Sequence, residues 1–140
     1  MKWLRGVLAR LLRAVGLARQ VFHVDDGAFV RVRATALDGL NRQPVAGVSI
    51  SIERPALGRE RGPRSSAAGE TDAAGRLDAE VLVRWWHFTS DPTAIVRAPG
   101  MTAVLTRSGF SDARISFSIE SLPRVGDAWE LDLGEVALTP

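Results

Sequence analysis

Cysteine and tyrosine are absent from this chain of 140 residues, and its only histidines are His23 and His87. The absence of cysteine excludes disulfide bonds, thiolate nucleophiles and thiolate metal ligands. The shortage of histidine leaves few groups for general acid–base catalysis, because histidine is the side chain that most often serves there. The composition is otherwise ordinary for one globular domain, with 46% hydrophobic and 24% charged residues. An enzyme with a histidine-rich or thiol-based site is therefore not expected.

Acidic residues are missing from the N-terminal segment, where the first carboxylate is Asp25. Five of the 18 basic residues precede it, which leaves 13 basic against 16 acidic residues and a net charge of −3 in the remainder. At about 100° per residue, the apolar side chains of residues 1–19 fall on one side of a helix and most of the basic ones on the other. We therefore predict a cationic amphipathic helix and a connection over residues 1–24, followed by a β-domain over residues 25–140.

This helix is the first candidate binding element. It would dock on an anionic membrane surface or on a partner protein. The residues expected to make the contact are Lys2, Trp3, Arg5, Leu8, Arg10, Leu11 and Arg13. Packing against the chain's own β-domain and cleavage as a targeting segment are the alternatives. Arginines interrupt every apolar run that would serve as the core of a signal peptide, and the segment is too short and too charged to span a bilayer. The expected location is cytoplasmic and peripheral at the membrane, with export as the alternative.

From residue 28 onward the apolar residues alternate with polar ones, which is typical of half-buried strands. Seven strands are expected, including one over residues 93–98 and one over residues 115–120. Residues 54–70 are rich in Gly, Pro, Arg and Ser and predict a long loop. Asp25-Asp26-Gly27 predicts a turn inside the connection at residues 20–27. The predicted fold class is all-β, a seven-stranded antiparallel Greek-key sandwich.

Four motifs carry a family resemblance. Leu37-Asp38 followed by Asn41–Ile50 (NRQPVAGVSI) is similar to the opening of transthyretin-like and carboxypeptidase-regulatory-like domains. Glu70–Leu77 (ETDAAGRL) resembles their T-D-x-x-G-R turn, and Ala98–Met101 (APGM) resembles their x-P-G turn. Leu133–Leu138 (LGEVAL) resembles their closing strand. The resemblance implies a seven-stranded sandwich, of a kind that mostly serves as a binding or spacer module.

One branch of that superfamily hydrolyses 5-hydroxyisourate, and the resemblance to it fails at the catalytic positions. Its opening motif T-H-V-L-D corresponds here to Ala34–Asp38 (ATALD), with Thr35 in place of the catalytic histidine. The chain ends in Ala137–Pro140 (ALTP) instead of the Y-R-G-S tail of that branch. The general base that would activate water is therefore missing, and we predict no enzymatic activity.

A second candidate surface is the aromatic run Trp85-Trp86-His87-Phe88. Neighbouring residues of a strand point to opposite faces, so at most half of this run can enter the core. Trp85, Trp86 and Phe88 are the candidate ligand residues, because exposed tryptophan is typical of binding surfaces. The alternative is that the run caps one end of the sandwich.

Three further sets of residues have weaker patterns. His87, Ser90 and Asp91 include the residue types of a hydrolytic triad, but their closeness in sequence does not supply its geometry. His23, Asp25 and Asp26 are too few for a closed metal site. The arginines of the predicted loop could contact phosphates or an acidic partner, or be solvated. They are Arg54, Arg59, Arg61 and Arg64.

The sequence thus predicts a non-enzymatic interaction module with no cofactor, no bound metal and no nucleic-acid partner, and a small-molecule substrate is not expected. The alternative is an exported cell-envelope domain in which Trp85 and Trp86 stack on carbohydrate or polymer, with the N-terminal segment acting in targeting. A divergent hydrolase is the third hypothesis. The ligand, the partner and the oligomeric state do not follow from the sequence.

Overall fold

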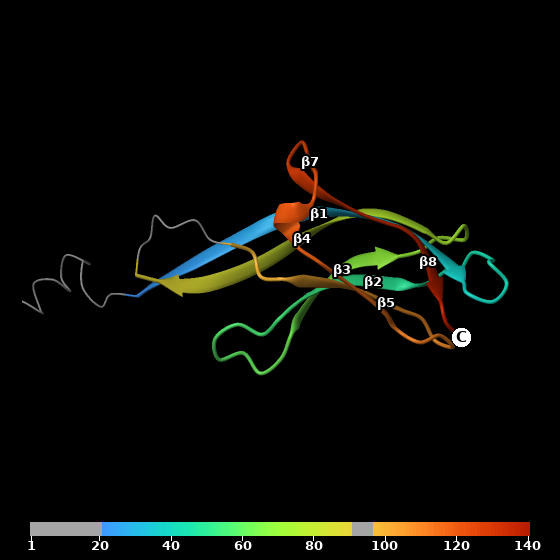
Figure 1. Ribbon diagram of the computed structural model, residues 1–140, viewed down its shortest axis with the longest axis horizontal. Helices are drawn as coiled ribbons and strands as arrows, with labels where there is room; N and C mark the ends of the chain where they lie inside the picture. Colours follow the sequence, from blue (N-terminus) through green and yellow to red (C-terminus); the bar gives the residue numbers. More distant parts are fainter. Residues whose placement is uncertain (1–20, 91–96) are drawn as a thin grey trace, which may run out of the picture. The chain divides into compact units, whose positions relative to one another are not determined.

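In a computed structural model of the chain, residues 21–90 and 97–140 are described, and they form strands with one short helical turn (Figure 1). The elements, in chain order, are β1 (Phe22–Asp38), β2 (Ser49–Arg54), β3 (Arg64–Glu70), β4 (Arg76–Thr89), β5 (Met101–Thr106), β6 (Ala113–Phe117), the 3₁₀ turn η1 (Ile119–Ser121), β7 (Arg124–Val125) and β8 (Ala128–Leu138). The chain divides into two compact units. Of the described residues, the smaller unit holds 21–26 and 86–90, and the larger holds 27–85 and 97–140.

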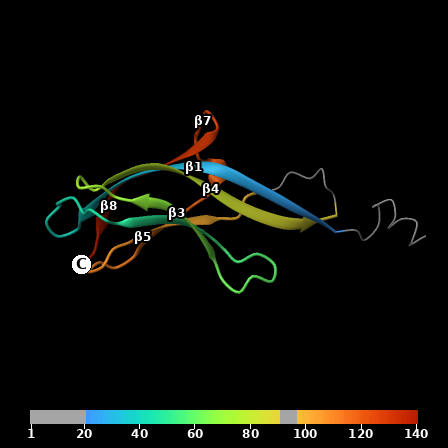
Figure 2. The same ribbon diagram turned by 180° about the vertical axis from the view of Figure 1, so that it is seen from behind.

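The larger unit is a sandwich of two four-stranded sheets with the strand orders β4-β1-β8-β7 and β3-β2-β5-β6. Figures 1 and 2 show β1, β4 and β8 in one layer and β2, β3 and β5 in the other. The prediction of an all-β sandwich is confirmed, with eight strands in place of seven. The expectation of a wholly antiparallel fold is wrong at one point, because β1 and β8 pair in parallel. Parallel neighbours need a crossover connection, and the intervening chain, which contains the whole second sheet, provides it.

The alternation of apolar residues gives the core as expected. The inward side chains of β1, β2 and β5 are buried between the sheets. The largest fully buried side chains of these three strands are Val30, Val32, Ile50, Ile52, Met101 and Leu105. Burial of side chains of this size contributes about 1.5–3 kcal/mol each, so these positions account for much of the stability of the larger unit.

The connection expected at residues 20–27 is instead mostly strand, because β1 begins at Phe22. The turn expected at Asp25–Gly27 is therefore wrong, and the predicted domain boundary falls inside β1. A Cβ on Gly27 would lie 3.2 Å from the carbonyl oxygen of Val83. The glycine allows β4 to approach β1 closely, which is the other common use of glycine in a strand.

The loop expected at residues 54–70 is shorter than predicted, because Arg64–Glu70 form β3 along the edge of the second sheet. Among the described strands, β3 pairs only with β2, and small side chains at residues 65–69 (SSAAG) give it no apolar alternation to detect. Its pairing with β2 is interrupted by a bulge between Ile50 and Ser51. The strand is thus defined by its neighbour and not by its own sequence pattern.

Two other expected strands also differ. The one expected at residues 115–120 ends at Phe117, and buried Ile119 lies in η1. The two-residue β7 forms a hairpin with β8 that the sequence did not indicate. The strand expected at 93–98 lies, except for Arg97 and Ala98, outside the described residues. The predicted N-terminal helix, with Lys2, Trp3, Arg5, Leu8, Arg10, Leu11 and Arg13, lies outside them as well.

The turn at Thr71–Arg76 is held as its sequence predicts. The Thr71 hydroxyl accepts a hydrogen bond from the amide of Val48 (3.0 Å) and donates one to the carbonyl of Val45 (2.7 Å). One carboxylate oxygen of Asp72 accepts from the amides of Ala74 (2.9 Å) and Arg76 (3.0 Å). The turn therefore joins β3 and β4 to the segment that leads into β2.

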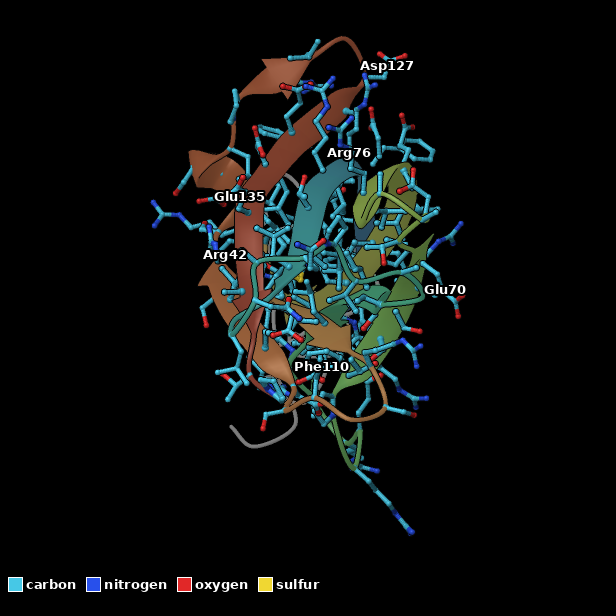
Figure 3. The ribbon with its side chains drawn as sticks, turned by 90° about the vertical axis from the view of Figure 1, so that its right-hand side faces the viewer. Arg42, Glu70, Arg76, Phe110, Asp127 and Glu135 are labelled. Carbon is cyan, nitrogen blue, oxygen red and sulfur yellow. The ribbon has the colours of Figure 1, made fainter. Side chains whose placement is uncertain are left out.

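Charged side chains project outward at the end of the larger unit seen in Figure 3. Arg42, in the loop after β1, donates to Glu135 of β8 at 3.1 Å, and the two lie side by side in that view. Both side chains are more than half exposed. Such an exposed pair contributes little stability, so this end is a solvated polar surface.

Candidate functional site

Three aromatic side chains gather in the smaller unit. Trp86 and Phe88 are two residues apart in β4, so they share one face of that strand. Their ring centroids are 5.1 Å apart and their planes are inclined by 72°. The His23 ring of β1 lies 5.2 Å from that of Trp86 and 5.5 Å from that of Phe88. We call these three residues the aromatic cluster.

Much of the aromatic cluster faces solvent. Phe88 is 59% exposed, the His23 side chain is 48% exposed and Trp86 is partly buried. Val21, the first described residue, is 61% exposed in the same unit. Tilted and edge-to-face ring pairs stabilise one another by about 0.5–1.5 kcal/mol beyond the area they bury. The cluster is therefore a partly exposed patch of packed aromatic rings.

Trp85 does not take part in this surface. It is 6% exposed and belongs to the core of the larger unit. Its Nε1 is buried and has no hydrogen-bond partner among residues 21–90 and 97–140. Of the three candidate ligand residues, the structure thus brings Trp86 and Phe88 together and turns Trp85 to the opposite face, as alternation along a strand requires.

His23 is the member of the cluster that the sequence analysis placed elsewhere. It was assigned to a connection before the first strand, whereas β1 already includes it. The signal was present, because Phe22 and Val24 flank it two residues apart and place His23 on the other face of a strand. The turn-forming residues that follow outweighed that pattern.

The weaker catalytic and metal patterns do not converge in the described part of the chain. His87 is partly buried and its Nδ1 has no hydrogen-bond partner there, while Asp91 lies outside the described residues. His23 Nε2 and Asp25 Oδ1 are 3.6 Å apart on an exposed surface. Within residues 21–90 and 97–140, no group of three or more His, Cys, Asp or Glu side chains is placed to hold a metal ion.

Arg54 proves to be a structural residue at the end of β2. It is 9% exposed, and its guanidinium donates to Glu60 at 2.6 Å and 2.9 Å and to the carbonyl of Arg84 at 2.8 Å. The bonds between Arg54 and Glu60 raise the pKa of Arg54 and, with the bond from the Leu57 amide, lower the pKa of Glu60 to about 2. Of the four arginines considered as phosphate contacts, Arg54 is therefore unavailable.

Open depressions on the described surface of the larger unit include two whose linings contain polar side chains. One of about 390 Å³ is lined by Gly47, Ser49, Thr106, Arg107, Ser108 and Asp112. The other, of about 200 Å³, is lined by Arg33, Ala34, Thr35, Arg76, Leu77, Asp78, Asp132 and Gly134. Small-molecule sites are enclosed and predominantly apolar, and the first depression has no apolar side chain larger than a methyl group. The aromatic cluster is the stronger candidate for recognition.

The smaller depression contains Thr35, which the resemblance described above aligns with the catalytic histidine of 5-hydroxyisourate hydrolases. Its carboxylates include Asp78, which accepts from Arg31 Nε at 2.8 Å and Nη2 at 2.9 Å. These hydrogen bonds and the charge of Arg31 lower the pKa of Asp78. A carboxylate with a lowered pKa is a weak base, so it is poorly suited to activate water.

Among the described residues, no helix has the length and apolar character needed to cross a membrane. No family model matches the chain, and no curated protein matches it. The comparison with solved structures does find similar chains. They include a 3-chlorocatechol 1,2-dioxygenase from Rhodococcus opacus 1CP (11% identity, TM-score 0.51), a chlorocatechol 1,2-dioxygenase from Pseudomonas putida (12%, 0.49) and a 9R-lipoxygenase from Cyanothece PCC8801 (16%, 0.40).

The matches cover 82%, 84% and 93% of this chain, but only 61%, 62% and 20% of the respective structures. This chain therefore spans about three-fifths of each dioxygenase and a fifth of the lipoxygenase. At such low sequence identity, the similarity to the Rhodococcus dioxygenase concerns the fold alone. The chain is an all-β sandwich structurally similar to part of that dioxygenase.

Proposed function

We propose that this chain is a non-enzymatic interaction module of transthyretin-like type that is held at an anionic membrane surface by its cationic N-terminal segment. The observation that carries the proposal is the aromatic cluster, which is partly exposed and whose His23 follows four residues after Arg19, the last basic residue of that segment. Amphipathic aromatic rings favour the membrane–water interface, where one edge is wet and the rest is apolar. Basic residues beside them add electrostatic attraction to anionic lipid.

The size of the effect is adequate for reversible binding. Each Lys or Arg near an anionic surface contributes about 1 kcal/mol, so five give an upper limit of about 5 kcal/mol. Burial of Phe88 and Trp86 in the head-group region would add to this. The sum corresponds to a peripheral module and not to permanent insertion.

The positions of the family motifs support the transthyretin-like assignment. The segment from Asn41 to Ile50 leads into β2, and the turn Thr71–Arg76 joins β3 to β4. Pro99-Gly100 directly precedes β5, and Leu133–Leu138 lie in β8. This order of strands and turns agrees with the resemblance and supports the proposal.

The alternative function is carbohydrate or polymer binding in an exported domain. A stacking platform needs an open, flat aromatic face. Trp86 and Phe88 cross at 72°, and Trp85 is in the core. The geometry therefore favours a membrane contact, or a contact with a partner protein, over sugar stacking.

The test is co-sedimentation of the full chain with vesicles of phosphatidylcholine alone and with added phosphatidylserine, over a range of salt concentrations. We expect binding to the anionic vesicles only, weakened by salt. Arg10→Gln/Arg13→Gln should reduce the electrostatic part, and Phe88→Ser should reduce binding at every salt concentration. Phe29→Ser, which removes an exposed phenylalanine from the larger unit, is the matched control and should have no effect. Equal sedimentation with and without anionic vesicles would overturn the proposal.

A further inference from the structure

The loop between β2 and β3, residues 55–63, is ordered around a single carboxylate. Glu60 accepts hydrogen bonds from Arg54 Nη1 (2.6 Å) and Nη2 (2.9 Å), from the amide of Leu57 (2.9 Å) and from Arg64 Nε (3.1 Å). Four donors nearly fill the acceptor sites of a carboxylate. Glu60 therefore has little capacity to neutralise any other basic side chain.

Arg54 fixes the base of this loop to the sandwich. Its guanidinium also donates to the carbonyl of Arg84 in β4 (2.8 Å) and to that of Pro55 (3.1 Å). A bidentate arginine–carboxylate pair is geometrically specific, and here it lies at the edge of the core. The loop is thus held between β2 and β4, the strand whose last residues carry Trp86 and Phe88.

The same bonds leave two arginines at the tip. The amide of Glu60 donates to the carbonyl of Leu57 (3.0 Å), and Gly58 has a φ of +56°. This hydrogen bond and the glycine conformation close a tight turn. Arg59 is exposed on the turn, and Arg61 is exposed two residues later. In the described part of the chain, neither side chain forms an ion pair, and Glu60 is the sole acid of the loop.

We infer that Arg59 and Arg61 form a second contact with the phosphate groups of anionic lipids, separate from the N-terminal segment. The inference rests on the proposed membrane function. The guanidinium group matches phosphate oxygens in a bidentate fashion and is weakly hydrated, which favours contact at a surface. Because Glu60 is already hydrogen-bonded within the loop, the charges of Arg59 and Arg61 are available to an external anion. Glu60 and Arg54 are positioning residues in this arrangement.

The experiment measures the partition coefficient of the full chain on phosphatidylserine-containing vesicles. One basic residue at an anionic surface corresponds to about a fivefold change in partitioning. Arg59→Gln/Arg61→Gln should therefore bind about 10–30-fold more weakly than the unmodified chain. The matched control is Arg76→Gln/Arg124→Gln, which removes the same charge from two exposed arginines at the starts of β4 and β7. Urea unfolding checks that both variants remain folded, as exposed side chains predict.

The outcomes separate this inference from the proposed function. A loss specific to the Arg59/Arg61 variant supports a contact at the loop. An equal loss in the loop and control variants means that only net charge matters, and it overturns the inference while membrane binding stands. If Arg10→Gln/Arg13→Gln has no effect but the loop variant does, the role of the N-terminal segment is wrong and the loop contact stands. If the unmodified chain does not bind vesicles, the inference and the proposed function are both overturned. Acidic protein partners are then the next candidates to test.

Discussion

Replacing Gly75 by alanine should destabilise the sandwich strongly, for two separable reasons. Gly75 has a φ of +72°, a conformation in which a side chain costs about 1–2 kcal/mol. In addition, an added Cβ would lie 2.5 Å from the carbonyl oxygen of Ala36 and 3.2 Å from the amide nitrogen of Val45. Those two backbone groups are hydrogen-bonded to each other at 3.0 Å, and Gly75 itself accepts from the Ala36 amide at 2.7 Å.

The magnitude follows from adding the two effects. Forcing extra atoms into a packed site typically costs about 1–3 kcal/mol, so Gly75→Ala should lower the free energy of unfolding by roughly 2–5 kcal/mol. Gly134 is the matched control, since its φ is +62° and an added Cβ would meet no atom within 4 Å. Gly134→Ala should therefore cost only about 1–2 kcal/mol, the backbone effect alone.

Urea unfolding followed by tryptophan fluorescence measures both variants, because Trp85 becomes exposed when the larger unit unfolds. Asparagine tolerates positive φ better than alanine. Gly134→Asn should then be nearly neutral, whereas Gly75→Asn should remain as damaging as Gly75→Ala. If the Gly75 and Gly134 variants lose the same stability, the close approach to Ala36 is not what requires glycine, and the reasoning fails.

Three further predictions concern the turn, the basic loop and the core. Thr71→Val should lose about 2–4 kcal/mol, because one buried and one partly buried backbone group lose their hydroxyl partner. Thr71→Ser should lose much less in the same urea assay, and equal losses would refute this role of the hydroxyl. The pKa of Glu60 is lowered to about 2, chiefly by hydrogen bonds from Arg54, so its stabilisation is present above its ordinary pKa of 4.5 and is lost as the pH falls toward 2. The difference in urea midpoint between the unmodified chain and Glu60→Gln should therefore be large at pH 7 and small near pH 2, and a difference independent of pH would contradict the assigned pair. Leu105→Ala should cost about 2–5 kcal/mol by leaving a cavity in the core, and a loss below 1 kcal/mol would mean that the side chain is not enclosed as the structure describes.

The core strands could be predicted because their alternation of apolar and polar residues is a local feature of the sequence. Val30 and Val32 of β1, or Ile50 and Ile52 of β2, mark an inward face without reference to any neighbour. β3 could not be found in this way, since its small residues acquire their strand conformation by pairing with β2. The same holds for the start of β1, where turn-forming residues lie within a strand that β4 stabilises from the side.

The candidate site was predictable in part for a similar reason. The alternation rule separates Trp85 from Trp86 and Phe88, but which of the two faces is buried depends on the opposing sheet. His23 joins the cluster only because β1 and β4 are neighbours, a contact between residues more than 60 positions apart in the chain.

By itself, the sequence determined the fold class, the inward residues of the main strands, and the cationic, acid-free character of the N-terminal segment. Those properties follow from periodicity and composition, which need no long-range contact. Only the tertiary structure decided that the Arg54 side chain is buried and hydrogen-bonded, while the side chains of Arg59 and Arg61 are exposed. The sequence does not separate these arginines, because all three lie in one predicted basic stretch. Arg54 is held because Glu60 and a carbonyl of β4 reach its guanidinium at the edge of the sheet, and that contact exists only in the folded structure.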